Sequence, residues 1–305
     1  MRKHRITEQA GAYSHRLAIA AALVVLAALG MASSALATPT GEFAVFKQCP
    51  IGSEGLKGCL ISKTESGEIK IGGTAVPIVA TQTLQGGFGR PNPETGQQPF
   101  YGAKNGETFS KTAQKVPGGL LDFVKCSEIK NIVVRVLCEG VFENDLTGVN
   151  AVTELAKPAS DIYLNEYALE GELPFPPYPP ALVLPVKIKL ENPLFGSECY
   201  IGSDSEPIEL ALTSGATSPP APNKSIHGKL GELTSKAEGK ILVIKKNTLV
   251  GNAFAVGKAH GCGLLGVLDG LIEAKLGLPS PAGKNTAVLN NTVEQAGHDA
   301  VEESE

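Results

Sequence analysis

Short apolar or alternating segments, separated by glycine and proline, dominate the chain beyond residue 37. Segments of this kind predict strands, and the 35 glycines and 21 prolines of the sequence predict the turns between them. We expect strands at Phe43–Lys47, Cys59–Lys63, Glu68–Ile71, Ala75–Thr83, Leu120–Lys125, Ile132–Cys138, Leu182–Leu190, Ile208–Thr213, Lys240–Lys245 and Leu249–Val256.

The clearest local signal lies between the second and third of these segments. Cys59–Lys63 and Glu68–Ile71 meet at Glu65-Ser66-Gly67, a sequence typical of a tight turn. We therefore expect these two segments to form a β-hairpin.

One segment departs from the strand pattern. Apolar residues recur at three- and four-residue spacing from Leu264 to Leu276, and Gly277 and Pro279 follow where a helix would end. This predicts a short amphipathic helix at about residues 264–276, which we expect to close one end of a β core. Its polar face carries Asp269, Glu273 and Lys275, which is not the basic face that helices lying on a lipid surface usually show.

These patterns predict a mainly β protein, a disulfide-stapled sandwich or barrel of one or two subdomains. Six prolines between Leu173 and Pro185 favour extended geometry and suggest a linker at 174–185. We expect a β-rich N-terminal region at 38–173, a β-rich C-terminal region at 186–289 and a disordered acidic tail at 290–305. The shared pattern Cys-x-Ile-Gly-Ser at Cys49 and Cys199 agrees with two related halves, although five positions do not establish a duplication.

Residues 1–37 have the features of a cleavable signal peptide. Basic residues precede an apolar run from Leu17 to about Gly30, and Ala35-Leu36-Ala37 supplies small residues for cleavage after Ala37. The apolar run is shorter than the roughly 20 residues that a membrane-spanning helix needs. We therefore expect a secreted or envelope-associated protein with no stable membrane insertion after cleavage, an uncleaved anchor being the alternative.

The charge balance argues against nucleic acid as a partner. The chain has 27 Lys and Arg residues against 31 Asp and Glu residues, and much of the acidic excess lies at the C-terminus. Neither a basic patch nor a nucleic-acid motif is evident. The expected partner is an extracellular or cell-envelope ligand whose identity the sequence leaves open.

All six cysteines follow the leader and are candidates for disulfides: Cys49, Cys59, Cys126, Cys138, Cys199 and Cys262. Six cysteines allow fifteen pairings. Proximity favours Cys49–Cys59 and Cys126–Cys138, which leaves Cys199–Cys262. The chain has no C-x-x-C motif and few histidines, so we expect no metal site and no cofactor.

Catalytic chemistry has weak support. No serine lies in a G-x-S-x-G motif, and His260 and His227 are the only credible general bases. Acidic pairs suited to hydrolysis exist at Glu143/Asp145, Asp204/Glu206 and Glu166/Glu170, but acids are numerous enough for such pairs to arise by chance. The sequence also has no Trp to form a sugar platform. We assign no catalytic residue.

Four segments resemble uncharacterised exported proteins of high-GC Gram-positive bacteria: Leu184–Leu190, Asn192–Leu194, Cys199–Ser203 and Gly277–Ala287. The resemblance extends over most of the chain beyond the leader. It implies export and carries no activity.

Three functional hypotheses remain. The first is a non-catalytic exported β protein that acts as a structural or binding module. The second is a secreted hydrolase that uses carboxylates with or without His260. The third is a binder of apolar molecules, suggested by the 42% hydrophobic content of the chain.

Overall fold

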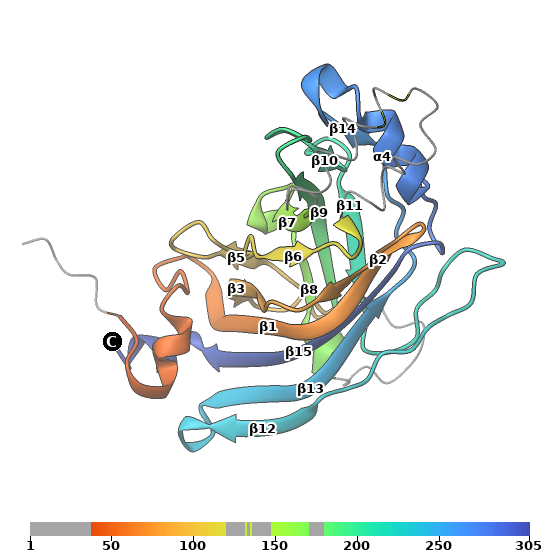
Figure 1. Cartoon of the computed structure of the whole chain (residues 1–305). Coiled ribbons are helices and arrows are strands. Elements are labelled where there is room, and N and C mark those ends of the chain that lie inside the picture. The colour runs from red at the N-terminus through yellow and green to blue at the C-terminus, as the bar shows by residue number, and fades with distance from the viewer. Residues whose placement is uncertain (1–37, 120–131, 133–134, 136–147, 171–179) are drawn as a thin grey trace, which may run out of the picture. The chain divides into compact units, whose positions relative to one another are not determined.

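The computed structural model describes residues 38–119, 132, 135, 148–170 and 180–305 (Figure 1). The chain divides into Met1–Thr38 and Pro39–Glu305, and every element described below belongs to the second unit. The predicted leader, cleavage site and Cys126–Cys138 disulfide lie outside the described residues. So do the predicted strand Leu120–Lys125 and nearly all of Ile132–Cys138.

The first sheet is antiparallel and has seven strands among the described residues. Its order is β12 (Glu232–Lys236), β13 (Ile241–Gly251), β15 (Thr286–Gly297), β1 (Leu56–Ile71), β3 (Gln82–Gly89) and β5 (Phe100–Gly102). The seventh strand, β2 (Thr74–Ile78), pairs with the second half of β1, while β3 pairs with the first half.

The second sheet is organised around β9 (Leu182–Glu191). One side of β9 pairs with β7 (Asn150–Leu155) and β8 (Tyr163–Asn165), and the other with β10 (Tyr200–Ile201) and β11 (Ile208–Leu212). The outer strands are β6 (Ala113–Lys115), β4 (Gln97–Gln98) and β14 (Ala259–His260). The mainly β fold predicted from the sequence is confirmed.

The two sheets share one hydrophobic core. On β9, every second residue from Leu182 to Leu190 is buried, and this alternation gives the strand one face toward the core. Leu289 and Val293 of β15 belong to the same cluster, although their strand lies in the other sheet. A pair of backbone hydrogen bonds between Thr213 and Val250 links the end of β11 to β13 and so joins the sheets.

The hairpin predicted at Glu65-Ser66-Gly67 is wrong, because β1 runs through these residues without turning. The glycine is needed for a different reason. Gly67 has φ +138°, and a Cβ atom there would collide with the carbonyl oxygen of Val288 on β15. It thus allows close approach of two strands, and the turn into β2 comes later, at Gly72, where φ is +52°.

Two β-bulges lie on either side of β15. The register of β1 shifts between Thr64 and Ser66, opposite Asn291 and Asn290. That of β13 shifts between Ile244 and Asn247, opposite Val293 and Asn291. Bulges bend and twist strands, and the long strands of this sheet are visibly curved in Figure 1. The predicted strands Lys240–Lys245 and Leu249–Val256 are therefore parts of one bulged strand, β13, which ends at Gly251.

The predicted helix at 264–276 is confirmed only in its second part. The α-helix α4 spans Asp269–Leu276, and a short 3-10 turn, η6 (Leu264–Gly266), precedes it. Leu265 interrupts the helical backbone with a left-handed φ of +55°. The predicted stop is confirmed, because Gly277 caps α4 in the left-handed conformation.

The other helical elements that the described residues form are short. They are η1 (Gly41–Phe46), η4 (Ala159–Asp161), α3 (Glu166–Glu170), η5 (Ala237–Gly239) and α5 (His298–Glu302). The strand predicted at Phe43–Lys47 is wrong, because most of this segment belongs to η1.

Residues 290–305 are not a disordered tail. They complete β15 and form α5, in which Val301 is fully buried. The acidic residues obscured an alternating pattern in which Val293 and Gln295 face inward while Glu294 lies between them. Charged residues on the outer face of a strand do not prevent its inner face from packing.

The predicted regions 38–173 and 186–289 do not form separate sheets. Strand β1 comes from the first region but pairs with β15 from the end of the chain, and β7 pairs with β9. Of the predicted linker 174–185, residues 174–179 lie outside the described part, and β9 already begins at Leu182. The prolines are therefore compatible with a connection inside one β unit.

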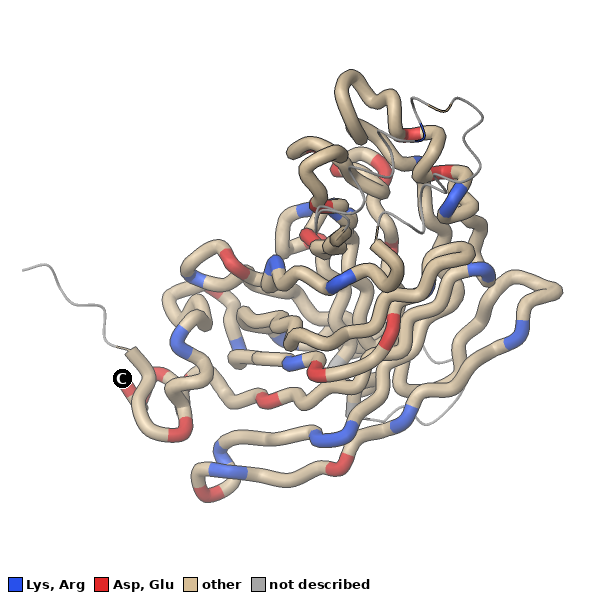
Figure 2. Tube along the Cα trace, in the orientation of Figure 1, with Lys and Arg blue, Asp and Glu red and all other residues tan. Residues whose placement is uncertain are grey.

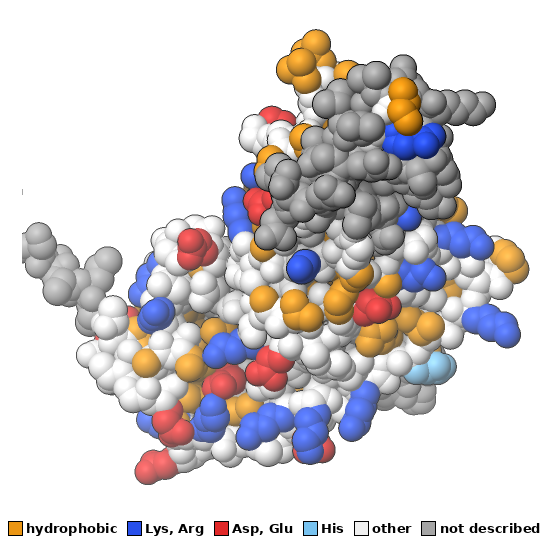
Figure 3. All heavy atoms as spheres, in the orientation of Figure 1, with side chains coloured by type: hydrophobic (Ala, Val, Ile, Leu, Met, Phe, Trp, Pro, Cys, Tyr) orange, Lys and Arg blue, Asp and Glu red, His pale blue; other side chains and the backbone are white. Residues whose placement is uncertain are grey.

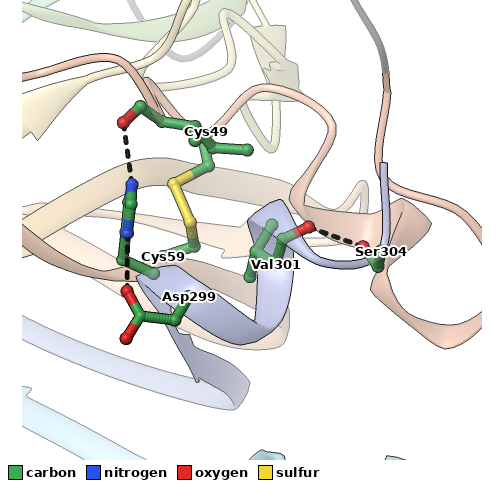
Figure 4. The surroundings of a disulfide bond; sticks show 7 residues. Cys49, Cys59, Asp299, Val301 and Ser304 are labelled. Carbon is green, nitrogen blue, oxygen red and sulfur yellow. Dashed lines mark hydrogen bonds and ion pairs between the residues drawn. A yellow bond between two sulfur atoms is a disulfide. The ribbon is translucent and has the colours of Figure 1, made fainter.

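Two predicted disulfides are confirmed, Cys49–Cys59 and Cys199–Cys262. The first lies in a second, smaller core cluster, on which Val301 of α5 packs (Figure 4). In the same region the imidazole of His298 bonds to Asp299 and to the carbonyl oxygen of Ile51, both at 3.0 Å. The N-terminal disulfide and the C-terminal helix are thus neighbours.

Candidate functional site: an apolar crevice between the sheets

A crevice of about 50 Å³ lies between the two sheets. Its walls are mostly aliphatic, with Ile69 and Val76 on the side of the first sheet and Ile188 and Leu190 on β9 of the second. Leu276, the last residue of α4, also lines it. Both sheets and the helix near the C-terminus therefore contribute to one apolar space.

A second space of about 30 Å³ continues the first. The two share Ile69, Gln82 and Thr153 as lining residues, so these side chains mark their junction. A cavity of roughly 150 Å³ admits benzene, and whole drug-sized ligands occupy roughly 300–1,000 Å³. Both spaces together are smaller than such a benzene-sized cavity, so they have room only for a few carbon atoms, such as the last two or three carbons of an alkyl chain.

Gln82, the first residue of β3, places a polar group at this junction. Its side chain is only 4% exposed, and its amide nitrogen Nε2 has no hydrogen-bond partner. Two other buried atoms in the described part share this condition, Oδ1 of Asn247 and Oδ1 of Asn252, but neither residue lines the crevice. An unpaired buried donor costs on the order of 1–3 kcal/mol, so it calls for an explanation.

Gln114 of β6 fastens the two sheets together beside the crevice. Its Oε1 accepts hydrogen bonds from the backbone nitrogens of Val79 and Ala80, at 2.9 and 3.1 Å, and its Nε2 donates to the carbonyl oxygen of Ala80 at 2.7 Å. Since residues 79–80 connect β2 to β3, this clasp joins the edge of one sheet to the edge of the other. The two glutamines that line the crevice thus differ in their hydrogen bonds. Both side-chain polar atoms of Gln114 have partners, whereas Nε2 of Gln82 has none.

The predicted base His260 lies elsewhere, at an exposed position of strand β14. Its Nε2 is 2.8 Å from the carbonyl oxygen of Gly202, and its ring stacks on Tyr200 with 5.9 Å between centroids. Lys187 lies over the same tyrosine ring, 5.0 Å from its centroid. This arrangement is a surface stack, and His260 lines neither part of the crevice.

Of the acidic pairs, only Asp204/Glu206 has described side chains, and neither of these two residues forms a hydrogen bond or ion pair with His260. Asp204 forms an ion pair with Lys187 at 2.7 Å, and this hydrogen bond raises the pKa of the lysine above its ordinary value. Burial raises the pKa of Tyr200. Glu206 belongs to a surface turn, in which its backbone nitrogen donates to Ser203. Asp204 is therefore held as the counter-ion of a lysine.

The side chains of most of the remaining catalytic candidates lie outside the described part of the chain. Glu143 and Asp145 lie outside the described residues, as do the side chains of Glu166 and Glu170. His227 is exposed. Within the described part of the chain, His, Cys, Asp and Glu side chains form no group of three that could hold a metal ion.

Sequence reasoning missed both Gln82 and Gln114. No motif surrounds either residue, and their importance depends on contacts between segments more than 30 residues apart. An apolar binding site was among the hypotheses, but the sequence pointed to no residue for it.

Comparisons with protein-family models, with curated proteins and with solved structures found no match. The resemblance to exported proteins of high-GC Gram-positive bacteria therefore stays a prediction. None of the helices in the described ranges is both long and apolar enough to cross a membrane. Basic and acidic positions are interspersed along the described strands (Figure 2).

Proposed function

We propose that this protein is a non-catalytic binding module that works outside the cytoplasm and receives a slender apolar group in the crevice between its sheets. The bound molecule carries a hydrogen-bond acceptor, which pairs with Nε2 of Gln82. The observation that carries the proposal is this single unpaired amide donor, 4% exposed, between aliphatic walls.

The chemistry of the crevice favours this class of ligand. An alkyl chain gains about 0.8 kcal/mol for each methylene group that it buries, and the aliphatic walls offer that environment. A carbonyl or ether oxygen at the junction would satisfy Gln82 and remove the cost of its desolvation. A charged group has no counter-ion among the lining residues, which are all uncharged.

Two disulfides support a location in an oxidising compartment. Export through the predicted leader would bring the chain there. A hydrolase is less well supported, since Nε2 of His260 contacts a backbone carbonyl and Asp204 is paired with Lys187.

Methyl-resolved NMR of the oxidised protein, titrated with methyl ethyl ketone, tests the proposal. We expect shifts at methyl groups of Ile69, Val76 and Ile188, and none at Ile241 or Val243 in the smaller core cluster. Gln82→Met keeps the volume but removes the donor, so it should weaken binding of the ketone about tenfold. Xenon, which makes no hydrogen bond, should enter both proteins equally well.

Replacing each of two alanines by methionine, one inside the crevice and one outside it, provides the matched control. Ala151 lines the crevice, whereas Ala75 of β2 does not. Ala151→Met should abolish the ketone shifts and Ala75→Met should leave them intact. Shifts that survive Ala151→Met, or that appear only in the smaller cluster, would contradict the proposal.

A further inference from the structure

Three aliphatic side chains project from the segment before α4. Leu264, Leu265 and Val267 are 82%, 95% and 73% exposed, and we call them the apolar tip. Figure 1 places this segment at one extremity of the Pro39–Glu305 unit, and Figure 3 shows hydrophobic side chains gathered there. Leu194, in a neighbouring loop, is 45% exposed.

The backbone of the tip is firmly held. Cys262, which precedes it, is bonded to Cys199, and its backbone nitrogen donates to Oδ1 of Asp269 at 2.7 Å. The carbonyl oxygen of Cys262 accepts from the backbone nitrogen of Leu268 at 3.0 Å, which closes the segment into a loop. Gly263 donates to the carbonyl oxygen of Phe195 at 2.8 Å and so ties the loop to that of Leu194.

Leu265 points outward although its backbone conformation is strained. Its φ of +55° lies in the left-handed region, where a leucine is strained and glycine is not. The side chain gains nothing in return from the fold, since it is almost fully exposed. A rigid, strained display of aliphatic groups to solvent indicates a surface that something else covers.

The segment that carries the tip has few ionisable side chains, which suits a partner without charge. Between Gly261 and Ile272 the only ionisable side chain is Asp269, and its carboxylate faces the backbone nitrogen of Cys262. When the tip enters a low-dielectric medium, no exposed charge of the tip loses its hydration, so this cost of burial is absent.

The size of the tip decides between a protein and a lipid as its partner. A stable protein interface buries roughly 800 Å² on each side and uses about 20–30 residues, often with aromatic anchors. Three or four aliphatic side chains fall well short of this. A bilayer needs no complementary shape, and it accepts aliphatic groups wherever they meet its surface.

We propose that the apolar tip docks the protein reversibly on the outer surface of a lipid bilayer by inserting Leu264, Leu265 and Val267 among the acyl chains. The protein stays peripheral, and the affinity is comparable to that of a single acyl anchor, with an association constant on the order of 10⁴ M⁻¹. This proposal is independent of the crevice.

Co-sedimentation of the oxidised protein with phosphatidylcholine vesicles tests the docking surface. The triple variant Leu264→Ser, Leu265→Asn, Val267→Ser should reduce the partition coefficient at least about tenfold, since asparagine tolerates the left-handed backbone. As a matched control, Leu230→Ser with Leu233→Ser alters two leucines that are about half exposed elsewhere, and it should leave partition unchanged.

Three further readouts separate the outcomes. Binding through an uncharged tip should persist at high salt and should not require anionic lipid. Ala151→Met, which fills the crevice, should bind vesicles like the wild type, so failure of the crevice proposal would not affect this one. Equal partition of the triple variant and the wild type would overturn docking by the tip. Loss of self-association in the triple variant without any vesicle binding would assign the surface to a second copy instead.

Discussion

Two ends of the Pro39–Glu305 unit each combine a disulfide with a short helix, but one end buries its aliphatic side chains and the other exposes them. At one end, Cys49–Cys59 lies beside α5, where Val301 is fully buried against the smaller core cluster. At the other end, Cys199–Cys262 precedes α4, and the loop between them holds Leu264 and Leu265 in solvent.

The difference shows what each cross-link does. At the first end the disulfide, η1 and α5 cover apolar residues of the sheet, so every part contributes to stability. At the second end the disulfide and the bonds of Cys262 fix a loop in which Leu264 and Leu265 contribute almost no burial. The short helix α5 covers apolar side chains at the first end, whereas nothing in the described structure covers Leu264 and Leu265 at the second.

Removing the disulfides should have the largest effects. The cross-links close loops with sequence separations of 10 and 63 residues. In the chain-entropy model, Cys199→Ala with Cys262→Ala should lower the free energy of unfolding by about 4 kcal/mol, and Cys49→Ala with Cys59→Ala by about 3 kcal/mol. Urea denaturation of the oxidised proteins measures both values. A larger loss at the Cys49–Cys59 end would mean that core packing there outweighs loop entropy.

Substitutions of single apolar residues sharpen the comparison. Val301→Ala should lower the free energy of unfolding by about 2 kcal/mol, because two buried methyl groups are lost and a cavity remains. Leu265→Gly should leave it unchanged or raise it by up to about 1 kcal/mol, because the left-handed strain is relieved. Thermal and urea unfolding give both numbers. A loss of stability in Leu265→Gly would show that the tip supports the fold after all.

The smallest expected effect is the pH dependence of the free energy of unfolding that arises from His298 of α5. The hydrogen bond to Asp299 raises the pKa of His298 above its ordinary value of 6.5, and the bond to Ile51 acts in the same direction while burial opposes it. The protonated histidine therefore stabilises the folded state below about pH 6.5, and this contribution is lost as the pH rises through the higher pKa of the folded protein.

Because Asp299 is exposed, we expect a loss of only a few tenths of a kcal/mol over this window. Urea unfolding at a series of pH values should show this decline in the wild type and its absence in His298→Gln. The same slope in both proteins would assign the pH dependence to other groups.

The sequence predicted those elements whose signal is local. Strands β9 and β11 were located closely because their alternating or apolar patterns end at turn residues. The pairing of Cys49 with Cys59, which are close in sequence, was also correct. The pairing of Cys199 with Cys262 remained once Cys126 was also assigned to its neighbour Cys138, and it is correct as well.

Errors arose where distant contacts decide the structure. Gly67 suggested a turn, but β15 uses it for close approach to β1. The acidic C-terminus suggested disorder, but one face of β15 packs in the core. The crevice could not be predicted, because Gln82 and Gln114 differ only in contacts that the folded chain creates.

The most direct test of the proposed function is the infrared carbonyl frequency of isotope-labelled methyl ethyl ketone bound to the oxidised protein. If Nε2 of Gln82 donates to the ligand, the bound carbonyl should absorb at a lower frequency than in an apolar solvent, and Gln82→Met should abolish this shift. An identical frequency in both proteins would contradict the account, because the unpaired amide would then have no part in binding.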